Sequence, residues 1–310
     1  MSPLEQAMHD YLRLRRSLGH DLAEAHWLLP SLVAFLEGRG ESTVTVEAAL
    51  AWVQQPRGHG GYSVGSRRMT VARGFARYLA GTDPATEIPP FGLVPRRVPW
   101  RPPFLFTSAA ITTLMAQAGR SIESPLRAST YQTLIGLLAA SGVRIGEAIK
   151  LDRSDIDWDQ GVLLIRESKF GKSRLVPLHP SSISALRDYD NLRDRLQPRP
   201  LEPSFFVSLK RKRLLYAVVS QTWRQLIDAT GIGAGAPSPP RLHDMRHSLA
   251  IQTLLGWYRS GEDVQARLPA LSTYLGHREP AHTYWYLSAC PELLALAAAR
   301  RDSNWLAARS

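Results

Sequence analysis

Two short segments of the sequence pair an arginine with a second polar group at helical spacing. Arg144 follows the turn-forming Gly142, and Glu147 comes three residues after it. His243 and Arg246 are likewise three positions apart, so on a helix they point to the same side. Guanidinium groups present planar pairs of N–H donors that fit two phosphate oxygens at once. The two segments therefore predict a site that binds a phosphate group.

A third segment and a turn supply the other groups that phosphoryl transfer needs. Tyr286 comes nine positions after His277, and Lys169 and Lys172 lie in a turn-like stretch between two apolar segments. A tyrosine hydroxyl has a pKa of about 10, so forming its anion at pH 7 costs about 4 kcal/mol. Nearby cations and a neutral imidazole that accepts the proton offset this cost, and an ammonium group can protonate the departing oxygen. Taken singly, these segments are typical of surface pairs, turns and core aromatics, but together their residue types suit phosphoryl transfer.

The acidic residues do not suggest a metal-dependent nuclease. Asp152, Asp155, Asp157 and Asp159 crowd together after the first arginine segment, but they lack the spacing of a calcium-binding loop. We interpret them as a polar turn before a strand. The sequence therefore predicts neither a metal ion nor another cofactor.

The overall charge indicates a polyanionic partner. Lys and Arg number 38 against 27 Asp and Glu, which gives a net charge of +11 and a sequence pI near 10.1. Such an excess favours double-stranded DNA before a membrane surface. We interpret these basic residues as contacts to DNA: Arg67, Arg68, Arg73, Arg77, Lys172, Arg174 and Arg241.

The residues that carry chemistry fall in the larger of two expected domains. Residues 1–80 show apolar side chains at helical spacing and predict a small helical domain. Residues 81–103 are rich in proline and predict an extended linker. Residues 104–310 predict helices and a hairpin of two strands, 161–167 and 174–178, with the lysines at its tip. The expected fold class is mainly α with a small β-sheet (α+β).

Several other protein classes are excluded. The single cysteine, Cys290, rules out an internal disulfide and a zinc ribbon. Charges run through the first thirty residues, and no apolar segment approaches the roughly 18 residues that span a bilayer. We expect a cytoplasmic protein that makes no membrane contact.

The order and spacing of six residues resemble the catalytic set of the tyrosine recombinases, also called the phage integrase family. The resemblance covers the larger domain, and the N-terminal helices with the linker are similar to that family's core-binding domain, which binds DNA. Residues 274–277 and 291–294 further resemble recombinases of small bacterial mobile elements. The resemblance implies these catalytic residues: Arg144, Lys169, His243, Arg246, His277 and Tyr286, with Glu147 in a supporting role.

The resemblance also implies an activity and an assembly. Tyr286 would attack a DNA phosphate, held by Arg144 and Arg246, and form a 3′-phosphotyrosyl bond, for integration or transposition of a mobile element. Four protomers on two DNA sites would act together, alone or with related recombinases, and the C-terminal tail would dock on the next protomer. Two other functions stay open: a non-catalytic DNA-binding scaffold for partner recombinases, and a tyrosine-type DNA topoisomerase.

Two alternatives remain inside the resemblance. Lys172 competes with Lys169 as the acid, and Tyr284 competes with Tyr286 as the nucleophile. The family's lysine opens the turn, and its tyrosine follows the second histidine by nine positions, so Lys169 and Tyr286 are preferred. Tyr284 would face another side of its helix, since two positions are about 200° apart. The remaining histidines of these segments, His247 and His282, are interpreted as structural or solvent-facing.

Overall fold

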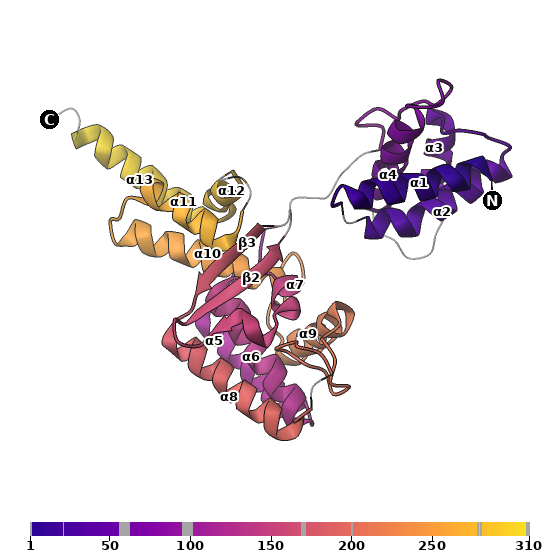
Figure 1. Cartoon of the computed structure of the whole chain (residues 1–310). Helices are drawn as coiled ribbons and strands as arrows, with labels where there is room; N and C mark the ends of the chain where they lie inside the picture. The colour runs from indigo at the N-terminus through magenta and orange to yellow at the C-terminus, as the bar shows by residue number, and fades with distance from the viewer. Residues whose placement is uncertain are drawn as a thin grey trace. The chain divides into compact units, whose positions relative to one another are not determined.

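The chain forms two compact units, Met1–Trp100 and Arg101–Ser310, in a computed structural model (Figure 1). The structure describes residues 2–20, 22–55, 63–94, 102–168, 172–199, 201–277, 279 and 281–307. Both units are built mainly from helices, and the second adds one small antiparallel sheet. The predicted fold class is therefore confirmed. Within the described residues, no helix is long and apolar enough to cross a membrane.

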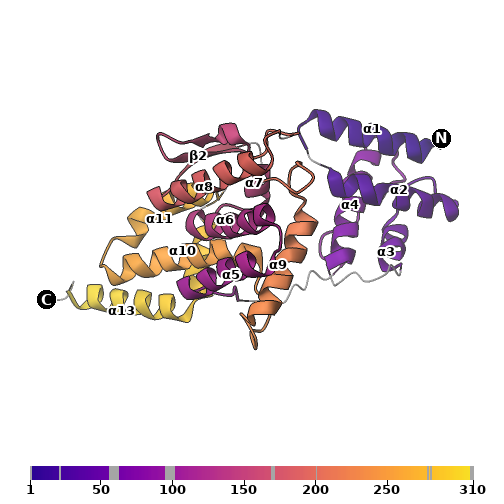
Figure 2. The same ribbon diagram turned by 90° about the horizontal axis from the view of Figure 1, so that it is seen from below.

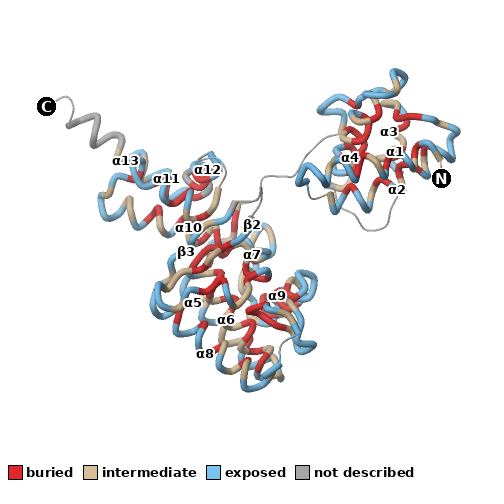
Figure 3. Tube along the Cα trace, in the orientation of Figure 1, coloured by how far each residue is buried: buried red, intermediate tan, exposed pale blue. Residues whose placement is uncertain are grey.

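The first unit contains the helices that its apolar spacing predicts. They are α1 (Pro3–Ser17), α2 (Ala23–Gly38), α3 (Val46–Gln54) and α4 (Ser63–Leu79). Ser2 and Thr45 begin α1 and α3 by accepting backbone N–H groups that the helices leave unpaired. The inward sides of the helices form one core, which includes Leu32, Trp52 and Phe75 (Figure 3).

The predicted linker is shorter than residues 81–103. The Glu87 backbone N–H donates to the Val44 carbonyl, and the Glu87 carboxylate accepts from the Val46 N–H, both at 2.8 Å. Residues 82–94 therefore pack on the first unit. At the other end, Phe106 is buried in the second unit, where its N–H donates to Ser248 Oγ. Residues 95–101, which contain several arginines of the linker, lie outside the described residues.

Two arginines predicted to contact DNA are instead buried in the first unit. Arg68 is 2% exposed and donates to the carbonyls of Trp52, Val53 and Gln55. Arg73 donates to two proline carbonyls: those of Pro89, at 2.6 Å, and Pro90, at 2.8 Å. A guanidinium buried in this way stabilises the domain, because its donors are already used by backbone groups.

The other two arginines of α4 lie at the surface, as a phosphate contact requires. Arg67 is exposed and lies 3.3 Å from a Glu24 carboxylate oxygen. Arg77 is exposed and lies over the ring of Phe91.

The second unit is arranged around one central helix, α6 (Pro125–Ser141). Helices α5 (Ser108–Ser121), α8 (Pro180–Leu196) and α10 (Leu242–Arg259) pack against it (Figure 2). The other helices are α7 (Ile145–Lys150), α9 (Tyr216–Thr230), α11 (Val264–Leu275), α12 (Ala281–Ala289) and α13 (Pro291–Ala307), with a short 3₁₀ turn η1 (Arg153–Asp155). Gly142 ends α6 in the left-handed conformation, with φ +61°. That reversal sends the chain directly into α7.

The sheet contains the predicted hairpin and one additional strand. Strands β1 (Ile156–Asp157), β2 (Val162–Ser168) and β3 (Lys172–Pro177) pair antiparallel in sequence order. We predicted a polar turn where β1 lies, because two residues flanked by aspartates give no alternation to detect. The hairpin tip, with Lys169, lies outside the described residues.

The beginning of α13 packs on its own domain. Leu293 is fully buried in a cluster with residues of α10, α11 and α12, and Glu292 forms an ion pair with Arg259 of α10. Arg300 donates to the carbonyl of Gly261, at 2.9 Å. Residues 291–300 thus pack on their own domain in this structure, and docking of the tail on a second protomer stays a prediction.

Removing the buried guanidinium of Arg68 should destabilise the first unit. Arg68→Ala leaves three interior carbonyls without this donor, at a cost of about 2 kcal/mol. Arg67→Ala is the matched control, since it removes an exposed pair worth less than about 1 kcal/mol. Hydrogen exchange of the full chain should show faster amide exchange in α3 and α4 for Arg68→Ala, with α5 and α6 unchanged. Equal protection in both variants would contradict the structural role.

Candidate active site

Four segments far apart in the sequence meet at one place in the second unit. They are the start of α7, the start of α10, the turn that follows α11, and α12 (Figure 1). Gly142 and Gly276 make the sharp reversals, both with positive φ, that bring two of these segments in. A Cβ atom at Gly142 would lie 2.8 Å from the Leu249 side chain of α10, so only glycine permits this close packing.

Arg246 lies at the centre of the site. It is 2% exposed, and it donates to the carbonyl of Gly142, at 2.8 Å, and to that of Leu275. Its charge opposes the rise that burial causes in the pKa of the nearby Tyr286 hydroxyl, so the candidate nucleophile and this guanidinium lie close together within one chain. Burial, followed by the charge of Arg144, lowers the pKa of Arg246 to about 10. Arg246 therefore keeps its charge at neutral pH.

Arg144 reaches the same place from the start of α7. Its Nη2 donates to the Gly276 carbonyl at 3.1 Å, and its Nη1 donates to Glu147 at 2.8 Å. The other Glu147 oxygen accepts the Arg144 backbone N–H at 2.9 Å, which closes the first turn of α7. Burial alone would raise the pKa of Glu147, but hydrogen bonds from Arg174 and Arg144 lower it to about 2. Glu147 is thus ionised and orients Arg144, as predicted for a supporting residue.

The two candidate tyrosines lie on different sides of α12. Tyr286 is 2% exposed and Tyr284 is 51% exposed. The geometry places Tyr286, and not Tyr284, beside Arg246. Burial raises the pKa of the Tyr286 hydroxyl, while Arg246 and Arg144 act in the opposite direction. The phenol is therefore protonated at neutral pH and must lose its proton to act as a nucleophile.

The two predicted histidines lie beside these groups in the neutral form. The His277 ring stacks on the Tyr286 ring, with centroids 5.9 Å apart. Burial and the charges of Arg246 and Arg144 lower the pKa of His277 to about 3 and that of His243 to about 4. A neutral imidazole is the form that accepts a proton from a phenol or a water molecule.

Two further side chains belong to the site but were not predicted. His247 lies between His243 and Tyr286, with ring centroids 4.6 Å and 5.5 Å away respectively. We interpreted His247 as solvent-facing or structural and so missed its place in the site. The sequence did carry a signal, because two helical residues four positions apart, such as His243 and His247, share a side. Thr283 is 1% exposed, and its hydroxyl lies 2.7 Å from His277 Nδ1. This contact orients the His277 ring.

The remaining predicted site residues differ in their surroundings. Arg174 does not face solvent: it donates to both oxygens of Glu147, which contradicts its prediction as a DNA contact. Arg241 is exposed and pairs with the buried Asp244. Lys169 and the side chain of Lys172 lie outside the described residues, so the choice between the two lysines stays a prediction.

The aspartates near η1 bind arginines. Asp152 and Asp155 accept hydrogen bonds from Arg166, and Asp152 also pairs with Arg213. Among the residues that the structure describes, no three His, Cys, Asp or Glu side chains gather as metal ligands would.

A basic turn next to α7 was also missed. Ser208 and Lys212 pair across it, and Arg211 adopts the left-handed conformation that usually favours glycine, with φ +59°. Lys210, Arg211 and Lys212 are exposed. The following Arg213 attaches the turn to α7 by donating to the Ile149 carbonyl at 2.8 Å. The run of basic residues in the sequence was a readable signal for this feature.

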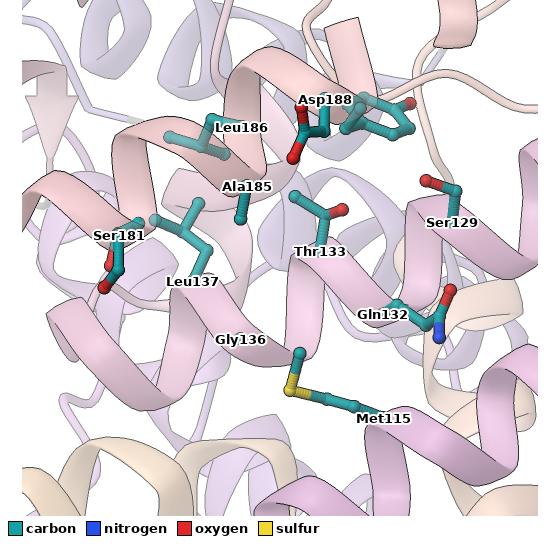
Figure 4. A pocket seen from close by; sticks show the side chains of 12 residues that line it. Met115, Ser129, Gln132, Thr133, Gly136, Leu137, Ser181, Ala185, Leu186 and Asp188 are labelled. Carbon is teal, nitrogen blue, oxygen red and sulfur yellow. The ribbon is translucent and has the colours of Figure 1, made fainter.

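A groove of the second unit lies apart from these residues. It runs between α5, α6 and α8, with a volume of about 370 Å³, and Met115, Gln132 and Asp188 are among the side chains that line it (Figure 4). None of the described residues lining it is basic. It is therefore unsuited to a phosphate.

Sequence comparisons agree with the geometry. The profile of the phage integrase family matches residues 106–292. The integrase/recombinase y4rB of Sinorhizobium fredii is 42% identical over 311 residues, which covers 98% of this chain and 99% of that protein. The tyrosine recombinase XerC of Chlamydia trachomatis is 29% identical over 211 residues, which covers 68% of this chain and 62% of that protein.

Solved structures share the fold. A Tn1549 transposon integrase in complex with transposon right end DNA superimposes with a TM-score of 0.66 at 16% identity, covering 95% of this chain and 98% of that one. A lambda integrase dimer bound to a COC′ core site gives a TM-score of 0.60 at 18% identity, covering 91% of this chain and 76% of that one. At such low identity the likeness concerns the fold.

The neutral histidines predict how stability depends on pH. His247 has a folded-state pKa of about 3, so between that value and about 6.5 the unfolded chain binds more protons than the folded one. The free energy of unfolding should fall as pH drops from about 6.5. His247→Asn should reduce this slope by at most about 1.4 kcal/mol per pH unit. Urea unfolding at several pH values between 7 and 5 measures it, and an unchanged slope in the variant would show that His247 is protonated in the folded protein.

Proposed function

Because the chain belongs to the phage integrase family, we propose that it is a site-specific DNA recombinase that breaks and rejoins DNA through a covalent bond to Tyr286. The observation that carries the proposal is that the buried Tyr286 stacks on the His277 ring in the same site as the buried Arg246. The nucleophile and the cation that would bind the phosphate are thereby assembled in the same protomer. Preorganised groups of this kind reduce the cost of reaching the transition state.

The proposed reaction has two balanced steps. In the first, the Tyr286 oxygen attacks the scissile phosphorus, its proton passes to a neutral imidazole, and the bond from phosphorus to the 5′ oxygen breaks. The departing 5′ oxygen takes a proton from the hairpin lysine, which we assign to Lys169. In the second step, a 5′ hydroxyl gives its proton to the lysine and attacks the phosphorus of the 3′-phosphotyrosyl bond. The bond from phosphorus to Tyr286 breaks, and the phenolate takes a proton back from the imidazole. The number of phosphodiester bonds is conserved, so the reaction needs no external energy source.

Arg144 and Arg246 are proposed to neutralise the nonbridging oxygens of the same phosphate. The carbonyls that fix each guanidinium leave its positive charge uncancelled, and Glu147 is shared between two arginines. A single arginine at a phosphoryl-transfer site is worth about 10³–10⁵ in rate, so two such groups supply a large part of the acceleration.

We also propose how the chain assembles on DNA, starting from its membership of the phage integrase family. Duplex DNA would contact the exposed cations of both units, including Arg67 and Arg77 of α4, Arg241 and the basic turn. Lys172 remains a predicted contact from the sequence. Exchange between two duplexes requires four active tyrosines, hence a tetramer of this chain, alone or with related recombinases. A role in moving a mobile element is supported by the fold shared with a transposon integrase.

Loss of the Tyr286 hydroxyl should abolish covalent attachment to DNA. A duplex nicked near the cleavage site traps the adduct, which a denaturing gel resolves from free protein. We expect the wild-type chain and the matched control Tyr284→Phe to form the adduct, and Tyr286→Phe to form none while its affinity for DNA stays within about threefold.

The other outcomes separate the alternative functions. Adduct formation by Tyr286→Phe would refute the assignment of the nucleophile. Specific binding without any wild-type adduct would indicate a scaffold. Relaxation of supercoiled DNA by a monomer at a single site would indicate a topoisomerase.

Removing charge from the basic turn should weaken DNA binding and its dependence on salt. Each lost phosphate contact lowers the slope of log K against log salt by about 0.9, so Lys210→Ala with Lys212→Ala should lower it by about 1.8. The control is Arg120→Ala with Arg187→Ala, two exposed cations on α5 and α8 of the same unit. Fluorescence anisotropy across a salt series measures both slopes, and identical slopes in the two double variants would exclude the turn from the interface.

A further inference from the structure

Arg174 joins three segments of the second unit through one side chain. It lies on β3, and its side chain is only 10% exposed. Its Nε donates to the Tyr274 carbonyl at 3.0 Å, while Nη1 and Nη2 donate to the two oxygens of Glu147 at 3.0 and 2.8 Å. The guanidinium therefore connects the hairpin to the start of α7 and to the end of α11.

The carboxylate that Arg174 binds is the one that orients Arg144. Glu147 accepts two hydrogen bonds from Arg174 and two from Arg144, and its own side chain is 8% exposed. A bidentate contact from a planar guanidinium fixes both the position and the plane of a carboxylate. The orientation of Arg144 thus depends on a residue of the hairpin.

The same guanidinium packs closely against the turn that leads to His277. A Cβ atom at Gly276 would lie 2.8 to 3.0 Å from three atoms of the Arg174 guanidinium. Gly276 also has a φ of +66°, which disfavours a side chain for a second reason. Arg174 binds the carbonyl of residue 274 and Arg144 binds that of residue 276, so the turn is held at two points next to His277.

The strand geometry shows why Arg174 can act in this way. Arg174 pairs with Ile165 of β2, and Val176, two positions further along β3, is fully buried. Side chains alternate along a strand, so Arg174 points to the same inner side as Val176, whereas Leu175 is 65% exposed. Arg174 is also five positions after Lys169, on the strand that returns from the hairpin tip.

We propose that Arg174 is a positioning residue that couples the lysine-bearing hairpin to the Arg144–Glu147 pair and to the His277 turn. The inference rests on the proposed function of the same site. The guanidinium N–H groups of Arg174 donate to acceptors inside the protein. Arg174 therefore acts on the reaction through Glu147 and the turn, and it makes no phosphate contact. A loss of this coupling leaves DNA bound but misaligns Arg144 with the phosphate.

The test uses the full-length chain with Arg174→Lys, which keeps the charge but removes the planar fork. The matched control is Arg166→Lys on β2, an arginine that binds Asp155 and Asp152 instead of Glu147. Single-turnover formation of the covalent adduct should fall about 10²-fold for Arg174→Lys, the effect of displacing a reacting group by about 1 Å. DNA affinity and its salt slope should match the wild type, and Arg166→Lys should cleave normally.

A double-mutant cycle with Glu147→Gln checks the route of the effect. If Arg174 acts through Glu147, the loss caused by Arg174→Lys should shrink at least tenfold when Glu147 is already replaced. Independent, multiplicative losses would overturn the inference. So would a salt slope lowered by about 0.9 in Arg174→Gln, which removes the charge, because that result identifies a phosphate contact.

The outcomes for this inference and for the proposed function are distinct. If the wild-type chain forms no adduct on its own end sequences, the proposed function fails. If the wild type forms the adduct and Arg174→Lys forms it at the same rate, only the positioning role fails. Thermal unfolding within a few degrees of wild type for Arg174→Lys shows that the fold is kept.

Discussion

The active site depends on a cation that is buried without a carboxylate partner of its own. Arg246 is 2% exposed and is held by the carbonyls of Gly142 and Leu275. Carbonyl dipoles satisfy the N–H donors of a guanidinium but leave its net charge in place, whereas a paired carboxylate would cancel it. The site therefore holds an uncompensated positive charge in the interior, which in the proposed reaction a phosphate would compensate.

The same uncompensated charge sets the protonation of the neighbouring groups. Repulsion from Arg246 and Arg144 adds to burial in keeping His243 and His277 neutral. Attraction from the same two arginines acts against the rise that burial causes in the pKa of Tyr286. The two arginines thus make the phenol easier to deprotonate, but they make each imidazole a weaker proton acceptor. Binding of a phosphate dianion or monoanion weakens both effects, so the timing of proton transfer is tied to the charge that develops at phosphorus.

The sequence alone predicted the helices, the hairpin and the spacing of the site residues, because these follow from periodicity and local order. It did not predict which basic side chains are internal. Arg68 binds carbonyls at the end of α3, and Arg174 binds Glu147 on a different element. Those partners are brought close only by the tertiary fold. The residues next to such an arginine in the sequence therefore carry no pattern that shows it to be internal. His247 was different, since its helical spacing from His243 was visible in the sequence and its meaning was underestimated.

Internal arginines also change what the net charge of +11 says about DNA binding. Arg68, Arg193 and Arg246 are at most 2% exposed, and Arg73 is 8% exposed. All four donate to backbone carbonyls. The planar guanidinium, with its five N–H donors, is better suited to this role than an ammonium group. Their charge still adds to the field that attracts a polyanion, but it makes no contact at the surface. The proposal therefore assigns attraction and contact to different residues. The total charge would govern how DNA approaches, and a smaller exposed set, together with Arg246, would govern how it is held.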